Sequence, residues 1–413
     1  EAESVRRTLD AQIGFDLFEM SSGPVGFVMG AEYTEEEFHN DNDSQSVAGA
    51  VFGTAGGNSA GSRHYYSVYA EAVFPVLDTL EIDVAIRYDD YQGFGDTVNP
   101  KIAIAYRPMD NLLLRASWGT GFRAPDLFIL NQAPAQSFPG AIDTLNCLAG
   151  DNFSCTNRQY ETLFLSNPAL GAEESTNKSA GVVWNATDGL TLGLQWYAID
   201  LTNQISSVTL AQLLTLESQG LVPTLLQTAA NVDRSNPTPR IVRDPVSNRI
   251  VLAVAPALNL SGFKTSGWDF DLNYHFGIGD IGEFELVSRY SRVTKFDTEF
   301  LPGSGFTTNL GFGLPEERMT VALNWALGDY AATFGMNHIG ESTSVIVGGT
   351  RTLDSYTTFD LQVSWMTPWD GKLTVGARNL FAEDPPIDTT GTLGHPQWSR
   401  FLHDALGRVP YIR

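Results

Sequence analysis

The chain alternates apolar and polar residues in about fifteen segments, and the connections between successive segments are short and long in turn. Alternation with a period of two is typical of a β-strand with one apolar face. Short turns after every second strand predict antiparallel hairpins, with the long connections gathered at the opposite ends of the strands. The expected strands are 9–17, 25–38, 65–76, 80–91, 101–107, 112–119, 177–184, 190–200, 268–276, 283–295, 318–327, 330–340, 357–365, 372–381 and one that begins near 409.

The pattern predicts an all-β fold, specifically a transmembrane antiparallel up-and-down β-barrel. Outer-membrane barrels have short periplasmic turns and long extracellular loops, whereas a soluble sandwich has no reason to alternate them. The 413 residues contain no apolar run of about 18 residues, so we expect no transmembrane helix. Five tryptophans near strand ends fit the aromatic girdles of such a barrel: Trp184, Trp196, Trp268, Trp325 and Trp365.

One region, 206–264, interrupts the alternation. Leucines from Leu210 to Leu221 predict a short helix, and two apolar runs around 241–243 and 250–252 predict a small hairpin. This region and the connection 121–176 are the longest loops, and binding residues belong in such loops.

The net charge of −23 argues against nucleic acid as a partner, since nucleic acid selects basic surfaces. Acidic runs such as Asp41–Asp43 fall in loops, and we interpret them as solvated surface. The alternative is a site for a divalent cation or a cationic ligand, although the glycine and distal glutamate of a calcium loop are missing.

The two cysteines, Cys147 and Cys155, lie close together in one loop. No histidine follows at a zinc-ligand spacing, so we expect a disulfide rather than a metal site. A disulfide implies an oxidising compartment. The six histidines are scattered and no catalytic motif is present, so we predict neither an enzyme nor a cofactor.

Four groups of motifs, in a fixed order, resemble those of the TonB-dependent outer-membrane receptors. The first group is Asn99-Pro100-Lys101, Arg107-Pro108 with Asp110–Leu112, Arg115–Ser117 and Gly119–Pro125. The others are Asn167–Leu170 with Glu173–Thr176, then Thr265–Asp269, and finally Val375–Phe381. The resemblance covers about three hundred residues and is far more specific than any single motif.

The resemblance implies a 22-stranded barrel that surrounds a plug domain. Closed bacterial barrels have even numbers of strands, so about fifteen strands indicate a missing part. We therefore expect residues 1–413 to be the C-terminal portion of the barrel, without the plug, the energy-coupling box, the signal peptide and the first strands. The ending at Arg413 departs from the family, which usually ends on an aromatic residue.

The resemblance also implies the function of a receptor that takes up a scarce nutrient by TonB-coupled active transport. Ferric siderophore is the default substrate, and cobalamin or an oligosaccharide are alternatives. The expected partners are the TonB complex, reached through the missing N-terminal region, outer-membrane lipid and a small nutrient ligand. The expected location is the outer membrane of a Gram-negative bacterium. A passive porin or adhesin barrel and a soluble surface-binding β-protein remain the other hypotheses.

Six residues are candidates for ligand binding. Arg115 and Arg123 belong to the receptor signature; they either pair with carboxylates in the lumen and hold the wall to the plug, or contact a ligand during transport. Side chains in the following loop either stack on and hydrogen-bond to a ligand or pack the loop on itself: Phe128, Asn131, Asp151 and Tyr160.

Overall fold

The structure is a computed structural model. It describes residues 2–48, 50–51, 55–299, 305–346, 349–387, 398–399 and 402–413.

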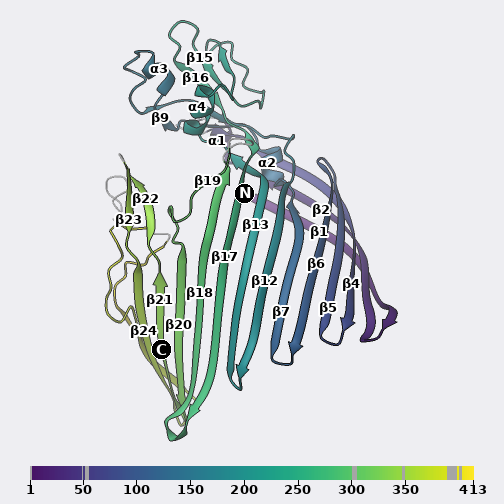
Figure 1. Cartoon of the computed structure of the whole chain (residues 1–413). Helices are drawn as coiled ribbons and strands as arrows, with labels where there is room; N and C mark the ends of the chain where they lie inside the picture. Colours follow the sequence, from purple (N-terminus) through teal and green to yellow (C-terminus); the bar gives the residue numbers. More distant parts are fainter. Residues whose placement is uncertain are drawn as a thin grey trace.

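The long strands form one curved antiparallel sheet in which each strand pairs with the next along the chain (Figure 1). Each expected strand is present, so the predicted all-β, up-and-down order is confirmed. The strands in order are β1 (Ala2–Met20), β2 (Gly23–Asn40), β4 (Ser59–Leu77), β5 (Leu80–Tyr91), β6 (Gly95–Met109), β7 (Leu112–Arg123), β12 (Glu173–Thr187), β13 (Leu190–Ser207), β17 (Ala257–Ile278), β18 (Gly282–Glu299), β20 (Glu317–Leu327), β21 (Tyr330–Ile339), β24 (Tyr356–Met366), β25 (Lys372–Arg378) and β26 (Val409–Ile412).

Turn residues set the short connections at the lower end of the sheet in Figure 1. Gly328 adopts a φ of +54° in the turn between β20 and β21, which suits glycine in a tight hairpin. The turn between β17 and β18 is a short 3₁₀ helix, η1 (Gly279–Ile281). β19 (Thr307–Thr308) adds a small pairing to the upper end of β18.

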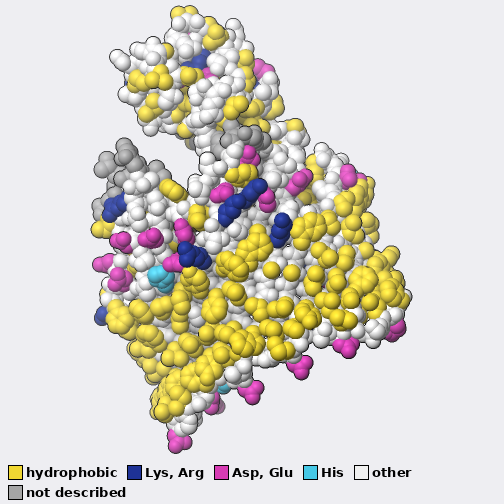
Figure 2. Space-filling model, in the orientation of Figure 1, with side chains coloured by type: hydrophobic (Ala, Val, Ile, Leu, Met, Phe, Trp, Pro, Cys, Tyr) yellow, Lys and Arg dark blue, Asp and Glu magenta, His cyan; other side chains and the backbone are white. Residues whose placement is uncertain are grey.

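The two faces of the wall differ in polarity, as the alternation predicts. On β5, Val84 and Ile86 are 42% and 51% exposed on the outer face, whereas Asp83 and Arg87 point inward to ion pairs. Figure 2 shows the outer face, where hydrophobic side chains form a broad band. In the described ranges, no helix has the length and apolar character needed to cross a membrane.

The tryptophans mark two levels of this band rather than only the strand ends. Trp184, Trp325 and Trp365 lie at the short-turn end of their strands, but Trp196 and Trp268 face each other in the middle of β13 and β17. The difference arises because the strands continue upward beyond the apolar band. On β17, the nine residues from Trp268 to Phe276 span about 26 Å, close to the height of a barrel's apolar band.

The long loops β2–β4, β7–β12 and β13–β17 contribute strands to a second sheet above the wall. We call this part the cap; it consists of residues 124–172 and 208–256 together with β3. Its strand order is β14 (Thr224–Leu226), β15 (Arg240–Arg243), β16 (Ile250–Val254), β11 (Thr162–Phe164), β8 (Ala135–Ser137) and β3 (Ala55–Gly56), the last contributed by the β2–β4 loop. The expected small hairpin is β15–β16, and the expected helix is α4 (Leu210–Ser218).

The remaining short elements also belong to loops. They are α1 (Ser44–Val47), α2 (Leu127–Asn131), α3 (Thr144–Leu148), the pair β9 (Gly140–Ala141) and β10 (Arg158–Gln159), and the pair β22 (Ser342–Ile346) and β23 (Gly349–Leu353).

Candidate ligand-binding site

The cap has a hydrophobic core of its own, which fixes the loops above the wall. Helix α4 begins with a capping box in which Thr209 and Gln212 satisfy each other's backbone N–H groups. Its Leu213 is fully buried in one cluster with Ile241 of β15, and Leu252 of β16 is fully buried in a second cluster. The loops are therefore a folded unit rather than a set of independent connections.

A buried ionic cluster joins three segments of the cap. Arg243 Nη1 lies 2.7 Å from Asp143 Oδ2, and Arg243 Nη2 lies 2.7 Å from Glu217 Oε2. All three side chains are at most 2% exposed. Burial alone lowers the pKa of the Arg243 guanidinium, but the hydrogen bonds to Glu217 and Asp143 outweigh burial and raise it above the usual range. The cluster ties the start of α3 and the end of α4 to β15.

The tip of the cap exposes cations around an aromatic ring. The guanidinium carbons of Arg158 and Arg249 lie 4.1 and 4.2 Å from the centre of the Phe153 ring. Arg249 also pairs with Asp151, with Nε 3.0 Å from Oδ2. The disulfide between Cys147 and Cys155 closes the same loop. The tip thus combines positive charge with an exposed aromatic surface.

The hydrogen bond from Arg249 is the main reason why the pKa of Asp151 is lowered to about 2. A lowered pKa stabilises the folded tip above the unfolded value of about 4. We expect this contribution to be lost as the pH falls from about 4 through about 2. A carbon-detected NMR titration of the Asp151 carboxyl checks this, and Arg249→Gln should return its pKa toward the usual range. Titration near pH 4 in both proteins would contradict the pairing.

The signature arginines make different contacts in the wall. Arg123, at the upper end of β7, donates two hydrogen bonds of 2.6 and 2.7 Å to Glu173 of β12. Glu173 also accepts a bond from the backbone N–H of Ile205, so it joins three strands. Arg115, eight residues lower on the same face, donates to the amide oxygen of Gln195 rather than to a carboxylate.

The other four candidate residues lie in two places. Phe128 and Asn131 are exposed on α2 at the upper edge of the wall, where the Phe128 ring meets Phe38 of β2 edge to face. Asp151 is at the tip of the cap, whereas Tyr160 is only 8% exposed and belongs to the cap core. Burial raises the pKa of Tyr160. The six residues therefore occupy the wall, its upper edge and the cap, and do not form one cluster.

The inner face of the first strands carries a polar network that sequence reasoning missed. Arg87 Nε lies 2.8 Å from Asp89 Oδ1, and Arg87 Nη2 lies 3.3 Å from Glu32 Oε2. Arg6 Nη2 lies 3.6 Å from Glu32 Oε1. Ser67 and Asp89 are at most 1% exposed and share a hydrogen bond of 2.6 Å. Charged residues two positions apart on the polar face of a strand, as in Arg87-x-Asp89, were the signal in the sequence.

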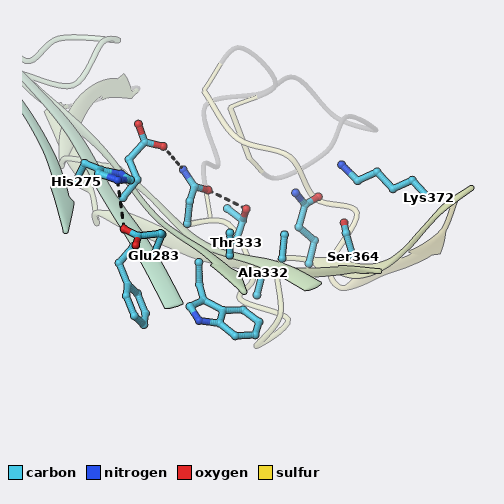
Figure 3. A pocket seen from close by; sticks show the side chains of 13 residues that line it. His275, Glu283, Ala332, Thr333, Ser364 and Lys372 are labelled. Atoms are coloured by element: carbon cyan, nitrogen blue, oxygen red, sulfur yellow. Dashed lines mark hydrogen bonds and ion pairs between the residues drawn. The ribbon is translucent and has the colours of Figure 1, made fainter. Parts of the chain in front are cut away.

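A groove of about 330 Å³, lined by both polar and apolar side chains, lies on the inner face near the short turns. His275 Nε2 lies 3.4 Å from Glu283 Oε2. Asn324 donates a hydrogen bond to Glu285 and accepts one from the Thr333 hydroxyl. Figure 3 shows Thr333, Ser364 and Lys372 rising from the same side of the strands. In the part of the chain that the structure describes, no group of three or more His, Cys, Asp or Glu side chains could hold a metal ion.

An antiparallel wall with an apolar outer face, a polar inner face and a loop-built cap defines a membrane β-barrel of the receptor class. The sequence model of the TonB dependent receptor-like β-barrel family matches residues 3–380, so the chain belongs to that family. Its members are receptors and transporters, not enzymes.

Relatives in this family include siderophore receptors. The ferric enterobactin receptor of Pseudomonas aeruginosa is 26% identical over 184 residues, which cover 43% of this chain and 23% of that protein. The ferrienterobactin receptor of Escherichia coli K12 is 20% identical over 362 residues, which cover 86% of this chain and 42% of that protein.

Solved structures share the fold over the whole chain. The siderophore receptor PirA from Acinetobacter baumannii aligns over 100% of this chain and 54% of its own, with a TM-score of 0.65 and 16% identity. A mutant of the P. aeruginosa ferric enterobactin receptor in complex with enterobactin also aligns over 100% of this chain and 54% of its own, with a TM-score of 0.68 and 17% identity. The chain thus spans about half the length of these structures and less than half of the curated relatives.

Proposed function

We propose that the protein takes up a ferric siderophore across the outer membrane of a Gram-negative bacterium by TonB-coupled transport. The observation that carries the proposal is that the relatives matched over most or part of the chain are named as receptors for ferric enterobactin or siderophores. Cobalamin and oligosaccharide are the competing substrates, and no described contact favours either of them.

The proposal includes the arrangement of the whole receptor. Residues 1–413 form the C-terminal portion of the barrel, and a plug with a coupling segment for TonB belongs to the same protein. Support comes from family membership and from the inward network of Arg87, Asp89 and Glu32, which offers charged groups to a domain inside the barrel. In the described sheet, β1 and β26 do not pair with each other, which supports additional strands between them.

The ligand would first meet the cap. Arg158, Arg249 and Phe153 at the tip suit an anionic, aromatic chelate, because they offer positive charge beside a ring. Exposure supports direct contact for four of the sequence candidates: Arg115, Arg123, Phe128 and Asn131. For Asp151 and Tyr160 the contacts favour a positioning role, since one pairs with Arg249 and the other is buried.

The test is uptake of radiolabelled iron from ferric enterobactin by iron-starved cells. Deleting either the receptor gene or the TonB gene should abolish uptake through this protein, and uptake that persists in both strains would refute the proposal. Small-solute flux that needs the receptor but not TonB would instead support the passive porin. Arg158→Gln should raise the concentration for half-maximal uptake, whereas Arg107→Gln, an exposed arginine at the short-turn end, is the matched control.

A further inference from the structure

An apolar pocket of about 330 Å³ lies at the upper ends of β18 and β20, where the loop 305–316 joins these strands. Within the loop, β19 pairs with the upper end of β18, and the backbone N–H of Asn309 donates to the carbonyl of Phe296. These hydrogen bonds fix the loop against the strand. The apolar part of the lining comes from Val293, Phe296, Leu310, Leu314 and Pro315.

The pocket faces the inside of the wall. Ser291 of β18 lines it and donates a hydrogen bond of 2.6 Å to Asp269 of β17. Asp269 pairs in register with Gln195, and Gln195 accepts the hydrogen bond from Arg115. Residues directly opposite each other on neighbouring strands share a face, so Ser291 lies on the same inner face as Arg115. Arg318 of β20 is opposite Ser291 and belongs to the same row.

Arg318 supplies positive charge at the border of this apolar surface. Its side chain lines the pocket and is exposed. Arg289, on the same face of β18, has its Nε 3.7 Å from Asp271 Oδ1, whereas Arg318 has no ion pair in the described part of the chain. The inner face of a membrane barrel is typically polar, so an apolar pocket beside an unpaired guanidinium on this face indicates a ligand.

Two glutamates also border the pocket, but their carboxylates bind residues of the outer face. Glu317 accepts a hydrogen bond of 2.6 Å from the Tyr290 hydroxyl, and Glu316 Oε2 lies 3.9 Å from Arg292 Nη2. Tyr290 and Arg292 flank Ser291 in the sequence, and adjacent residues of a strand point to opposite faces. The charge that remains free on the inner side is therefore that of the guanidinium.

We propose that this pocket holds an acyl chain of the transported chelate and that Arg318 binds a carboxylate beside that chain. The inference rests on the proposed function, because it assigns the pocket to the ligand inside the barrel. A mostly aliphatic lining suits a flexible alkyl chain, since apolar burial has no preferred direction. A guanidinium binds a carboxylate in a defined orientation. The substrate class is thus an amphiphilic ferric siderophore that contains both a carboxylate and an acyl chain.

The experiment measures the binding of ferric chelates to the full-length receptor in lipid nanodiscs by isothermal titration calorimetry. The chelates share one citrate-dihydroxamate head and carry an acetyl, butanoyl, octanoyl or hexadecanoyl chain. We expect the affinity to rise by up to about fourfold for each buried methylene and to reach a plateau once the chain fills the pocket. An increase that continues to the longest chain, and that empty nanodiscs reproduce, would show partition into lipid and overturn the proposal.

Two substitutions separate the chain from the head. Leu314→Ser removes apolar lining and should weaken binding of the octanoyl chelate about threefold while leaving the acetyl chelate unchanged. Arg318→Gln should weaken binding of both chelates about tenfold. Leu221→Ser is the matched control for the first variant, because Leu221 is 61% exposed in the cap and Leu314 is 57% exposed at the pocket. The control should bind every chelate like the wild type.

Equal affinity along the chain series, or unchanged octanoyl binding in Leu314→Ser, would overturn the acyl site. Faster hydrogen exchange of the plug in Leu314→Ser, with chelate binding unchanged, would assign the pocket to a plug side chain instead. Uptake of ferric enterobactin tests the proposed function separately. TonB-dependent uptake together with equal affinities along the series would leave the proposed function standing and remove only this inference.

Discussion

The variant Arg243→Met is expected to unfold the cap while the barrel wall stays folded. The substitution leaves Asp143 and Glu217 buried without their cation, and breaking a buried ion pair in this way costs about 3–5 kcal/mol. The cap is small, so a loss of this size is enough to open it. Hydrogen exchange measured by mass spectrometry should show faster exchange in 208–256 and unchanged protection in β12 and β13.

Arg249→Met serves as the control for this prediction. Arg249 also pairs with an aspartate in the cap, but its side chain is 46% exposed, so solvent screens the pair and compensates for its loss. We expect little change in exchange outside the tip. If both variants exchange like the wild type, the Arg243 cluster does not hold the cap together.

The second large effect concerns the apolar band. Leu272 lies on the outer face of β17, midway between Trp268 and Phe276, and therefore near the middle of the membrane. Leu272→Arg is expected to destabilise the receptor by about 2–4 kcal/mol, because a charged side chain at this depth must be held in lipid. Urea unfolding in lipid bilayers, followed by gel mobility of the folded form, measures the change.

The neighbouring residue provides the matched substitution. Asn273 points to the polar inner face, where its amide lies 3.4 Å from Glu285, so Asn273→Arg should be tolerated. Equal destabilisation by both arginines would mean that the two faces of the wall do not differ as the alternation predicts. A greater effect at position 273 would assign the lipid to the other face.

The wall could be predicted from the sequence because its determinants are local. Side chains alternate along each strand, and turn residues such as Gly328 and Asp329 fix where each hairpin reverses. The upper ends were underestimated because the strands continue past the membrane, where both faces meet water and the apolar signal disappears. β13 extends to Ser207 and β17 starts at Ala257, well beyond the expected bounds.

The cap could be predicted only in part, because distant contacts hold it together. The helix α4 and the β15–β16 hairpin follow from local patterns, but Arg243 meets Asp143 across 100 residues and Arg249 meets Asp151 across 98. Many other acidic residues in this chain could have been the partner of either arginine. The sequence also left open whether Tyr160 contacts a ligand or packs the loop on itself, and its burial in the cap core comes from residues far along the chain.

The cap sheet has a consequence for how receptors of this kind diversify. Strands from the β2–β4, β7–β12 and β13–β17 loops share one set of hydrogen bonds, so a change of length in one loop alters the register of the others. A chimaera that receives a single loop from a relative would inherit strands without their partners. New ligand preferences should therefore arise by exchange of the three loops together. We expect the cap to evolve as one unit.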